Sequence, residues 1–445
     1  MIDGADKMIL GKNAVFSTNS RVTGVNNNVI VCGGSGCGKT MSVSEPLLLE
    51  AFGRSLVVTV TKRRIVEKYT PMLRDRGYIV EELNFANPEK STVAFDPLDY
   101  IRSTRDITFL AQAIVKSNPR KESSNADPYW DEASVSLLSA EIGKVRDSGK
   151  GGFPEVLEMH KSLTLNDNCG SLIGTSLDDD FEELEEEDPT GFTVSCWRSF
   201  KNLPIKTASC IYGTLNVAVD TVFTPELLES MKNRKKVDFI SLASKKTVLF
   251  VTTSAVNPSL NCFVNLFYSQ VFKSLFEFGE SRADGRLPIP VHVLCDDFAT
   301  GSRILNFPEY ISIFREKGIS VTLLVQSESQ LEGMYGQSNA TTIINNCDTY
   351  VYMGGMDLTT SKSVSTRANL PLEDILYMPI GREFIFRRGQ KPIITERYDI
   401  EGDDRYTKIT DAHARRQASS KSSSDDHMTF RDYIEFSLGK TLKTN

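Results

Sequence analysis

The chain has 445 residues, a formal net charge of -7, 40% hydrophobic residues and 24% charged residues. This composition is ordinary for a globular protein, and the length allows two or three domains with substantial cores. No stretch approaches 18 consecutive apolar residues, which excludes a transmembrane helix, and the first residues lack the basic and apolar parts of a signal peptide.

The first strong pattern in chain order is an apolar strand, Asn28–Val31, that runs into a G-x-x-x-x-G-K-T motif. In such a motif the glycines let backbone N–H groups close around the phosphates of a nucleotide. The lysine adds a cation, and the threonine hydroxyl can bind Mg²⁺. A helix-compatible stretch, Met41–Ala51, follows, as the motif requires, so the sequence predicts that the chain binds ATP and Mg²⁺. The predicted nucleotide-binding residues are Gly33, Gly34, Ser35, Gly36, Cys37, Gly38, Lys39, Thr40 and Met41, with Lys39 also catalytic and Thr40 also a metal ligand.

Short β-branched runs alternate with helical patterns along much of the chain, which is typical of an α/β fold. Between about 127 and 237 strands are lacking and apolar residues recur at helical spacing. The sequence therefore predicts a helical domain, 125–236, inserted into a nucleotide-binding domain formed by 1–124 and 237–400. The predicted strands are Asn28–Val31, Leu56–Val60, Thr247–Thr252, Val291–Leu294, Ser320–Val325, Thr349–Met353 and Glu383–Phe386.

Two segments are conspicuously polar. Nine acidic residues lie in the run 178–188, and without them the net charge would be positive, so overall charge says little about a nucleic-acid channel. This run predicts a solvated loop or frayed helix, and a docking surface for a basic partner is the alternative. Beyond about 401 the chain becomes polar and serine-rich, which predicts a flexible tail over 401–445.

The cysteines and histidines point to no metal cluster. Eight cysteines are scattered without a C-x-x-C pair, and the four histidines lie far apart in sequence. That pattern favours reduced thiols in a cytoplasm over a disulfide framework or a zinc site.

A phosphate loop needs an acidic partner at the end of a neighbouring strand. The best candidate follows the strand Val291–Leu294, where Cys295 is succeeded by Asp296 and Asp297. We expect Asp296 to touch Mg²⁺ or a metal-bound water, and Asp297 to orient or deprotonate the attacking water. Two adjacent aspartates also occur at ordinary strand ends. The functional interpretation of this pair therefore depends on the phosphate loop upstream.

Two further residues fit an ATPase of several subunits. Arg315 lies late in a helix that ends at glycine, from which it could reach the γ-phosphate of a neighbouring subunit as an arginine finger. The alternative is a surface arginine paired with Glu309 or Glu316. Gln326 follows the strand Ser320–Val325 and could sense the γ-phosphate, or it could simply cap the strand end.

In order and spacing, the motifs resemble those of type IV secretion coupling proteins, the TraG/TraD group of conjugation machines. The cytoplasmic ATPase portion of the Gram-positive conjugative-element branch is most similar, and the resemblance covers Ile9 to Asp399. The motifs are Asn26–Asn28 before the phosphate loop, Asp127–Trp130 opening the insertion, Asp296–Gly301, Arg315–Ile319, Gln326–Leu331 and Asn345–Cys347.

The resemblance implies a RecA-like P-loop NTPase domain with a central, mostly parallel sheet and an inserted all-α domain. It implies a homohexameric ring with each ATP at a subunit boundary, in the cytoplasm at the inner face of the cell membrane. The ring would receive a relaxase bound to single-stranded DNA and deliver it to the other components of the secretion channel. The all-α domain would take part in substrate recognition. Asp297 stands where the family usually has Glu, Arg315 at the finger position, and Gln326 at the glutamine motif.

The chain departs from the family pattern in three ways. The family normally begins with transmembrane helices, so we expect either a missing membrane segment or a separate membrane subunit on which the chain docks. The strand that usually ends in Asp-Pro-Lys-Gly-Glu here continues as Thr61, Lys62, Arg63 and Arg64. These three cations could line a channel for single-stranded DNA, or form a solvated cluster. Asp297 is one methylene shorter than Glu, and loss of one well-placed contact can slow turnover by roughly 10²-fold, which predicts weak hydrolysis.

Three functions remain compatible with the sequence. The first is an ATP-driven translocase for the relaxase–DNA complex, and the second is a nucleotide-gated docking adaptor that barely hydrolyses ATP. The third is a pump for double-stranded DNA of the FtsK/HerA kind. DNA-stimulated ATP hydrolysis separates the first from the second, and preference for duplex DNA at controlled salt marks the third.

Overall fold

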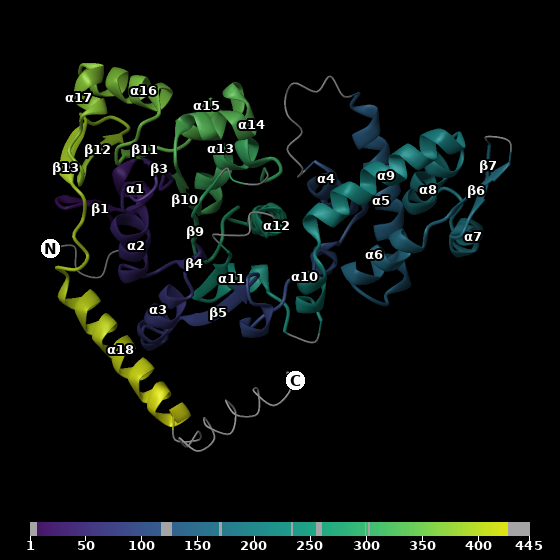
Figure 1. The fold of residues 1–445 in the computed structure, drawn as a ribbon, viewed down its shortest axis with the longest axis horizontal. Coiled ribbons are helices and arrows are strands. Elements are labelled where there is room, and N and C mark those ends of the chain that lie inside the picture. The colour runs from purple at the N-terminus through teal and green to yellow at the C-terminus, as the bar shows by residue number, and fades with distance from the viewer. Residues whose placement is uncertain are drawn as a thin grey trace, which may run out of the picture.

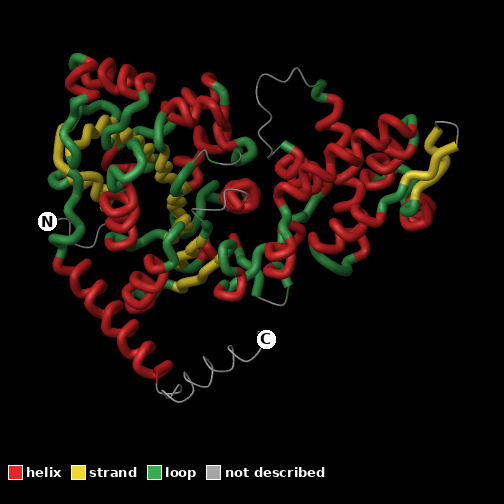
Figure 2. The backbone as a smooth tube through the Cα atoms, viewed as in Figure 1, coloured by secondary structure: helices red, strands yellow, loops and turns green. Residues whose placement is uncertain are grey.

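The computed structural model describes residues 7–116, 127–168, 171–232, 235–254, 260–298, 300 and 303–425. Figure 1 shows two parts, one built on a large sheet and the other a group of helices beside it. Figure 2 shows that strands gather in the first part, whereas the second is helical apart from a two-stranded ribbon at its far end. None of the helices in the described ranges combines the length and apolarity needed to cross a membrane.

The central sheet has nine strands in the order β13-β12-β11-β3-β10-β9-β4-β8-β5. The strands from β11 to β5 run parallel, and β12 and β13 add an antiparallel edge. All carboxyl ends of the parallel strands therefore meet at one edge of the sheet, where ligands bind in open α/β folds. The strands are β3 (Val29–Cys32), β4 (Ser55–Val60), β5 (Ile79–Asn84), β8 (Thr247–Thr252), β9 (Val291–Cys295), β10 (Ile319–Val325), β11 (Thr349–Tyr352), β12 (Arg382–Arg387) and β13 (Ile393–Glu396).

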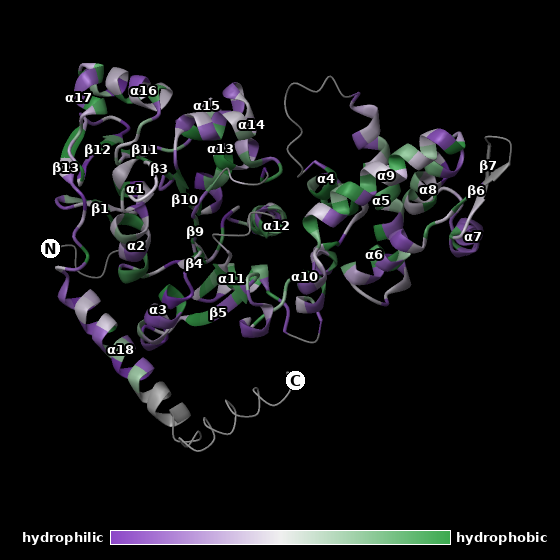
Figure 3. Cartoon of the chain, in the orientation of Figure 1, coloured by the Kyte–Doolittle hydropathy of each residue, from purple (hydrophilic) through white to green (hydrophobic). Residues whose placement is uncertain are grey.

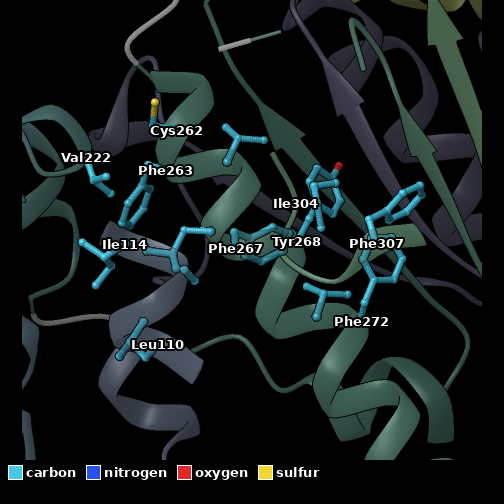
Figure 4. Packing of buried hydrophobic residues seen from close by; sticks show 14 of the residues in the cluster. Leu110, Ile114, Val222, Cys262, Phe263, Phe267, Tyr268, Phe272, Ile304 and Phe307 are labelled. Carbon is cyan, nitrogen blue, oxygen red and sulfur yellow. The ribbon is translucent and has the colours of Figure 1, made fainter. Parts of the chain in front are cut away.

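Helices cover both faces of the sheet, which explains why its inner strands are apolar at nearly every position. Alternate residues of β4 belong to different cores: Leu56 and Val58 pack with α2 and α3, and Val57 with the cluster that contains α12. Figure 4 shows the aromatic side chains of α12 in that second cluster, next to Leu110 and Ile114 of α4. The helices and turns of this part are α1 (Ser20–Thr23), the π-turn η1 (Thr40–Ser44), α2 (Glu45–Leu49), α3 (Arg64–Asp75), the 3-10 turns η2 (Pro88–Lys90) and η3 (Pro97–Tyr100), α4 (Thr104–Val115), α11 (Phe239–Ser244), α12 (Leu260–Glu280), α13 (Phe307–Lys317), α14 (Glu328–Tyr335), α15 (Gln337–Asn345), α16 (Leu358–Ala368) and α17 (Leu372–Leu376).

The helical part packs around α5, which contacts α4, α6, α8 and α9. Its core contains Phe181 and Trp197, whose rings stack with centroids 4.2 Å apart. α4 also contacts α12, so it joins the helical part to the sheet. The elements are α5 (Tyr129–Ser148), α6 (Phe153–Ser162), β6 (Leu165–Asn168), β7 (Ser171–Thr175), α7 (Asp178–Glu187), α8 (Phe192–Lys201), α9 (Ile205–Val222) and α10 (Pro225–Ser230).

The structure differs from the sequence-based expectations in four places. The acidic run forms the helix α7, hydrophilic in Figure 3, because Phe181 anchors it to the core while two of its acids pair with Arg198 and Lys201. A short hairpin, β6–β7, occurs where only helices were expected. The sequence also missed β5 and β13 of the sheet, and the separate hairpin of β1 (Lys7–Gly11) and β2 (Ala14–Ser17).

The fourth difference is the predicted flexible tail. Residues Asp404–Asp425 form the helix α18, which contacts α3. Its first turn is held by polar contacts: Arg405 pairs with Glu50 (2.6 Å), and the hydroxyl of Tyr406 accepts a hydrogen bond from Lys68 (3.1 Å). Residues 426–445 of the predicted tail lie outside the described residues.

Candidate nucleotide site

The phosphate loop, residues 33–41, leaves the carboxyl end of β3 in the middle of the sheet. The N–H of Gly33 donates to the last carbonyl of β10 (3.1 Å), and the N–H of Gly34 donates to Gly354 O beyond β11 (2.9 Å). Gly38 has a φ of 93°, a conformation that residues with a side chain rarely adopt. The predicted nucleotide-binding residues therefore form one continuous curve of backbone, held at its start by both neighbouring strands.

Lys39 lies across this curve. Its Nζ donates to the carbonyls of Gly33 (2.5 Å) and Gly34 (3.2 Å), so the ammonium occupies the inside of the loop. Thr40 opens the π-turn η1, which continues directly into α2. The first N–H groups of such a turn have no partner within the helix and favour an anion. The loop thus presents one cation and a set of backbone donors to a phosphate.

Two carboxylates follow β9, two strands away from β3 in the sheet. Burial and the neighbouring Asp297 raise the pKa of Asp296 to about 6. Asp296 Oδ1 accepts a hydrogen bond from the N–H of Asp297 (3.1 Å), and Asp297 has a φ of 52°, which is uncommon outside glycine. The backbone is therefore strained where the second carboxylate stands, a feature that concentrates at functional sites.

The donor set at this edge fits magnesium. Mg²⁺ prefers carboxylate and hydroxyl oxygens and completes its shell with water and nucleotide phosphates. Asp296 and Thr40 supply such oxygens, and the charge of Lys39 lies close enough to Asp296 to lower its pKa. Within the described residues no cluster of three or more His, Cys, Asp or Glu could hold a metal.

Gln326 lies in the same cavity as the two carboxylates. Asp296, Asp297 and Gln326 all line a cavity of about 210 Å³, together with polar side chains from the ends of β4 and β8. The backbone N–H of Gln326 donates to Gln330 Oε1 (3.2 Å) at the start of α14. Three of the predicted site residues, from two strand ends, are thereby brought to one hollow.

Arg315 lies at the opposite edge of the sheet. It stands near the end of α13, just before β10 begins, and lines a cavity of about 370 Å³ with Arg21, Arg54 and Arg286. Among the described residues it makes no ion pair, so the alternative pairing with Glu309 or Glu316 is not formed. Arg315 and the phosphate loop of the same chain therefore lie at opposite edges of the sheet.

The basic triplet after β4 does not act as one unit. Arg63 forks onto the buried carboxylate of Glu82, with N–O distances of 3.0 and 3.2 Å, and also pairs with Glu67. Arg64 is exposed at the start of α3. Lys62 is exposed too, and its charge lowers the pKa of Asp296, which places it beside the carboxylates. Arg63 is therefore engaged within the fold, and only its two neighbours remain candidates for DNA.

Residues 3–367 match the family described as type IV secretory system conjugative DNA transfer. The chain belongs to this family. Its fold is similar to the bacterial conjugative coupling protein TrwB in complex with sulphate, with a TM-score of 0.64 and 18% identity over 83% of this chain and 85% of that one. It is also similar to TrwB in complex with a non-hydrolysable ATP analogue, with a TM-score of 0.64 and 17% identity over 83% and 85%. VirB4 of Thermoanaerobacter pseudethanolicus gives a TM-score of 0.55 and 13% identity over 91% and 100%.

At these low sequence identities, similarity to the solved structures supports a conclusion about the fold alone. The predicted class, a RecA-like P-loop NTPase with an inserted all-α domain, is confirmed. No curated protein matches the chain in sequence. The Gram-positive branch stays a prediction, as do the roles of the individual site residues.

Two motifs of the family have a structural role here. Asn28 Oδ1 accepts from the N–H of Val321 (3.1 Å), and its Nδ2 donates to Asn346 O (3.0 Å). Asn26 Oδ1 accepts from the N–H of Asp348 (3.2 Å). The asparagines before β3 and before β11 thus tie the starts of three parallel strands together. Of the motif that begins at Asp296, residues 299 and 301 lie outside the described residues.

Sequence reasoning missed Arg397, which follows the edge strand β13. Its guanidinium donates to the carbonyl of Cys37 in the phosphate loop. A Cβ on Gly38 would clash with it, so the two lie in direct contact. A lone arginine after a short edge strand carries no motif, and only the fold brings it to the loop.

Proposed function

We propose that the chain binds Mg²⁺-ATP at the phosphate loop and uses its hydrolysis to deliver a relaxase bound to single-stranded DNA to a secretion channel. One observation carries this proposal. In a chain of the conjugative DNA transfer family, the phosphate loop, Asp296, Asp297 and Gln326 converge at one edge of the sheet.

Each residue has a role that its position supports. Lys39 and the backbone N–H groups of the loop would neutralise and orient the phosphates, while Thr40 and Asp296 would hold Mg²⁺. Bound Mg²⁺ supplies charge that stabilises the leaving phosphate oxygens. Asp297 would orient or deprotonate the attacking water, and Gln326 would contact the γ-phosphate from the same hollow.

Arg315 supports assembly into a ring. Its place at the amino edge of the sheet suits a contact in which it enters the nucleotide site of the next subunit, so that hydrolysis requires an oligomer. A homohexamer closes such head-to-tail contacts. The ring would stand at the inner face of the cell membrane, against the membrane-embedded part of the machine, with the helical part turned toward the relaxase.

The test is ATP hydrolysis by the full chain with and without single-stranded DNA. We expect DNA to stimulate hydrolysis, and Lys39→Ala to abolish it, because the loop loses its only side-chain cation. Lys90→Ala is the matched control, since Lys90 is exposed in the turn after β5. Undetectable hydrolysis in assembled wild-type protein at saturating ATP would contradict the proposal.

The docking adaptor is a second candidate, favoured by Lys62. The charge of Lys62 acts on Asp296 from a place where the family usually carries acids, and it would oppose the binding of Mg²⁺ there. An adaptor would bind ATP tightly and turn it over slowly, and it would bind a relaxase through the helical part. Asp297→Glu should then raise the rate, because the longer side chain reaches the water; an unchanged rate counts against the adaptor.

A further inference from the structure

A second cavity, of about 640 Å³, lies on the other side of the phosphate loop from Asp296 and Gln326. Gly38, Met41 and Ser42 form one wall, and residues 379–382 and 396–401 form the other. In the sheet, β10 and β9 stand on one side of β3, and β11, β12 and β13 stand on the other. The loop therefore separates a hollow with carboxylates and a glutamine from a roomier one built by the antiparallel edge.

Arg397 connects this second cavity to the loop. Besides its hydrogen bond to Cys37 and its contact with Gly38, its backbone N–H donates to Gly381 O (2.8 Å). The charge of Arg397 also acts on Glu383, whose carboxyl group is fully buried with both oxygens lacking a hydrogen-bond partner in the described structure. Arg397 thus contacts the phosphate loop directly and interacts through its charge with a buried carboxyl group.

The outer wall is fixed in place by polar contacts. Tyr398 donates its hydroxyl hydrogen to Asp403 Oδ2 (2.7 Å), and Arg405 bonds both Asp403 and Glu50 (2.7 and 2.6 Å). Glu50 caps α2, the helix that continues from the phosphate loop. The wall and the loop are therefore parts of one framework, as a preorganised binding site requires.

The order of groups along a nucleotide fits the two hollows. Backbone N–H groups of such a loop cradle the α- and β-phosphates, and the lysine reaches the β- and γ-phosphates. With the γ-phosphate toward Asp296 and Gln326, the ribose and base must leave on the other side. There the apolar side chains of Met41 and Ile380, 37% and 96% exposed, border the cavity and offer apolar surface to a base.

We propose that Arg397 binds the α-phosphate and that this cavity takes the ribose and base of the nucleotide. The assignment rests on the proposed function, since it requires the triphosphate in the phosphate loop. It gives residues 396–401 a part in nucleotide binding, so that the antiparallel edge and α18 respond to the nucleotide.

The experiment measures the affinities of the full chain for ATP and for inorganic tripolyphosphate by calorimetry. Ile380→Asp should weaken ATP about 10-fold and leave tripolyphosphate unchanged, because only ATP has a base. Arg397→Ala should weaken both ligands by about 10- to 100-fold, since a hydrogen bond to a charged group is lost. Met356→Asp and Arg74→Ala are the matched controls; Met356 is 90% exposed and Arg74 is exposed on α3, both outside the cavity.

The outcomes separate the two proposals. If neither ligand binds in a manner that depends on Lys39, the proposed function fails and this assignment with it. If binding depends on Lys39 but either Ile380→Asp or Arg397→Ala keeps wild-type affinity for ATP, this assignment alone is overturned. Tighter binding by Arg397→Ala would also overturn it, because the arginine would then obstruct the loop.

Discussion

The two edges of the central sheet differ in how their polar groups are partnered. At the amino edge, Asn28 bonds the N–H of Val321 (3.1 Å) and Asp348 accepts from the N–H of Asn26 (2.5 Å). At the carboxyl edge, Asp296 is half-buried beside a second carboxylate in a strained turn. One edge is thus arranged for stability, and the other keeps charge and strain that a ligand would relieve. Substitutions at the amino edge should therefore lower stability, whereas substitutions at the carboxyl edge should lower activity.

Arg315 is the exception at the amino edge, because it has no ion pair within the described structure and lines an open cavity. We expect Arg315→Ala to lower turnover by roughly 10³-fold while ATP affinity stays unchanged, as for an arginine finger that acts in trans. ATP hydrolysis and ATP binding are measured on the same preparation. Arg282→Ala, at an exposed arginine outside the cavity, should change neither the turnover nor the ATP affinity.

A mixing experiment sharpens this prediction. Arg315→Ala and Lys39→Ala subunits, each inactive alone, should regain part of the activity when combined, because mixed rings contain intact sites. Mixed samples as inactive as the separate variants would place Arg315 outside the reaction.

Asp296 should show the opposite pattern from a structural residue. Asp296→Asn is expected to slow hydrolysis by roughly 10²-fold, since a metal ligand is weakened. The melting temperature should hold or rise, because the substitution neutralises a half-buried carboxylate that stands next to another one. Asp284→Asn, at an exposed loop residue, controls for the change of charge. A clear fall in melting temperature would mean that Asp296 serves the fold.

Substitution of Asn28 should have the reverse effect and lower the stability of the fold. Asn28→Ala leaves the N–H of buried Val321 without the asparagine oxygen and removes one of the two side-chain hydrogen bonds to the carbonyl of Asn346, which lowers the free energy of unfolding by about 2 kcal/mol. Urea unfolding measures the loss. Asn27→Ala, which removes one half-buried bond to Thr18 O (2.7 Å), should lose less. Equal losses in the two variants would remove the distinction between them.

The parallel core of the sheet was predictable because its strands are continuous apolar runs. Thr247–Thr252 was predicted with the bounds that β8 has, and the aspartates after β9 followed from the rule that ligands gather at strand ends. β5 was missed because it contains Glu81 and Glu82, and the carboxylate of Glu82 is buried with Arg63 and Thr252, which reach it from other elements. Its burial depends on a tertiary contact that no local pattern announces.

The same limit explains the errors at the antiparallel edge. α18 is mostly polar, so its composition predicted a flexible tail, but Tyr406 and Ile409 pack against the core beside α3, and Lys68 and Glu50 hold its first turn. Arg397 belongs to no motif and meets the phosphate loop only after β12 and β13 have paired. Motifs thus located the phosphate end of the candidate site, and the fold was needed for the rest.

The smallest expected effect concerns two buried carboxyl groups, one near each edge of the sheet. Asp348 at the amino edge pairs with Arg388 (3.2 Å), whereas Glu383 near the carboxyl edge has no hydrogen bond in the described structure. Burial raises the pKa of Glu383 from 4.5 to about 8, against the opposing charge of Arg397. The folded state therefore holds a proton that the unfolded chain has released above about pH 5.

Stability from this proton is fully present below pH 4.5 and is lost as the pH rises through 8. We expect the free energy of unfolding to fall by roughly 1.4 kcal/mol from pH 6 to pH 7 on this account. Glu383→Gln, which keeps the shape and cannot ionise, should flatten that slope, while Glu158→Gln on exposed α6 should leave it unchanged. Urea unfolding at the two pH values decides the matter: an equally steep slope in Glu383→Gln would show that other groups set it.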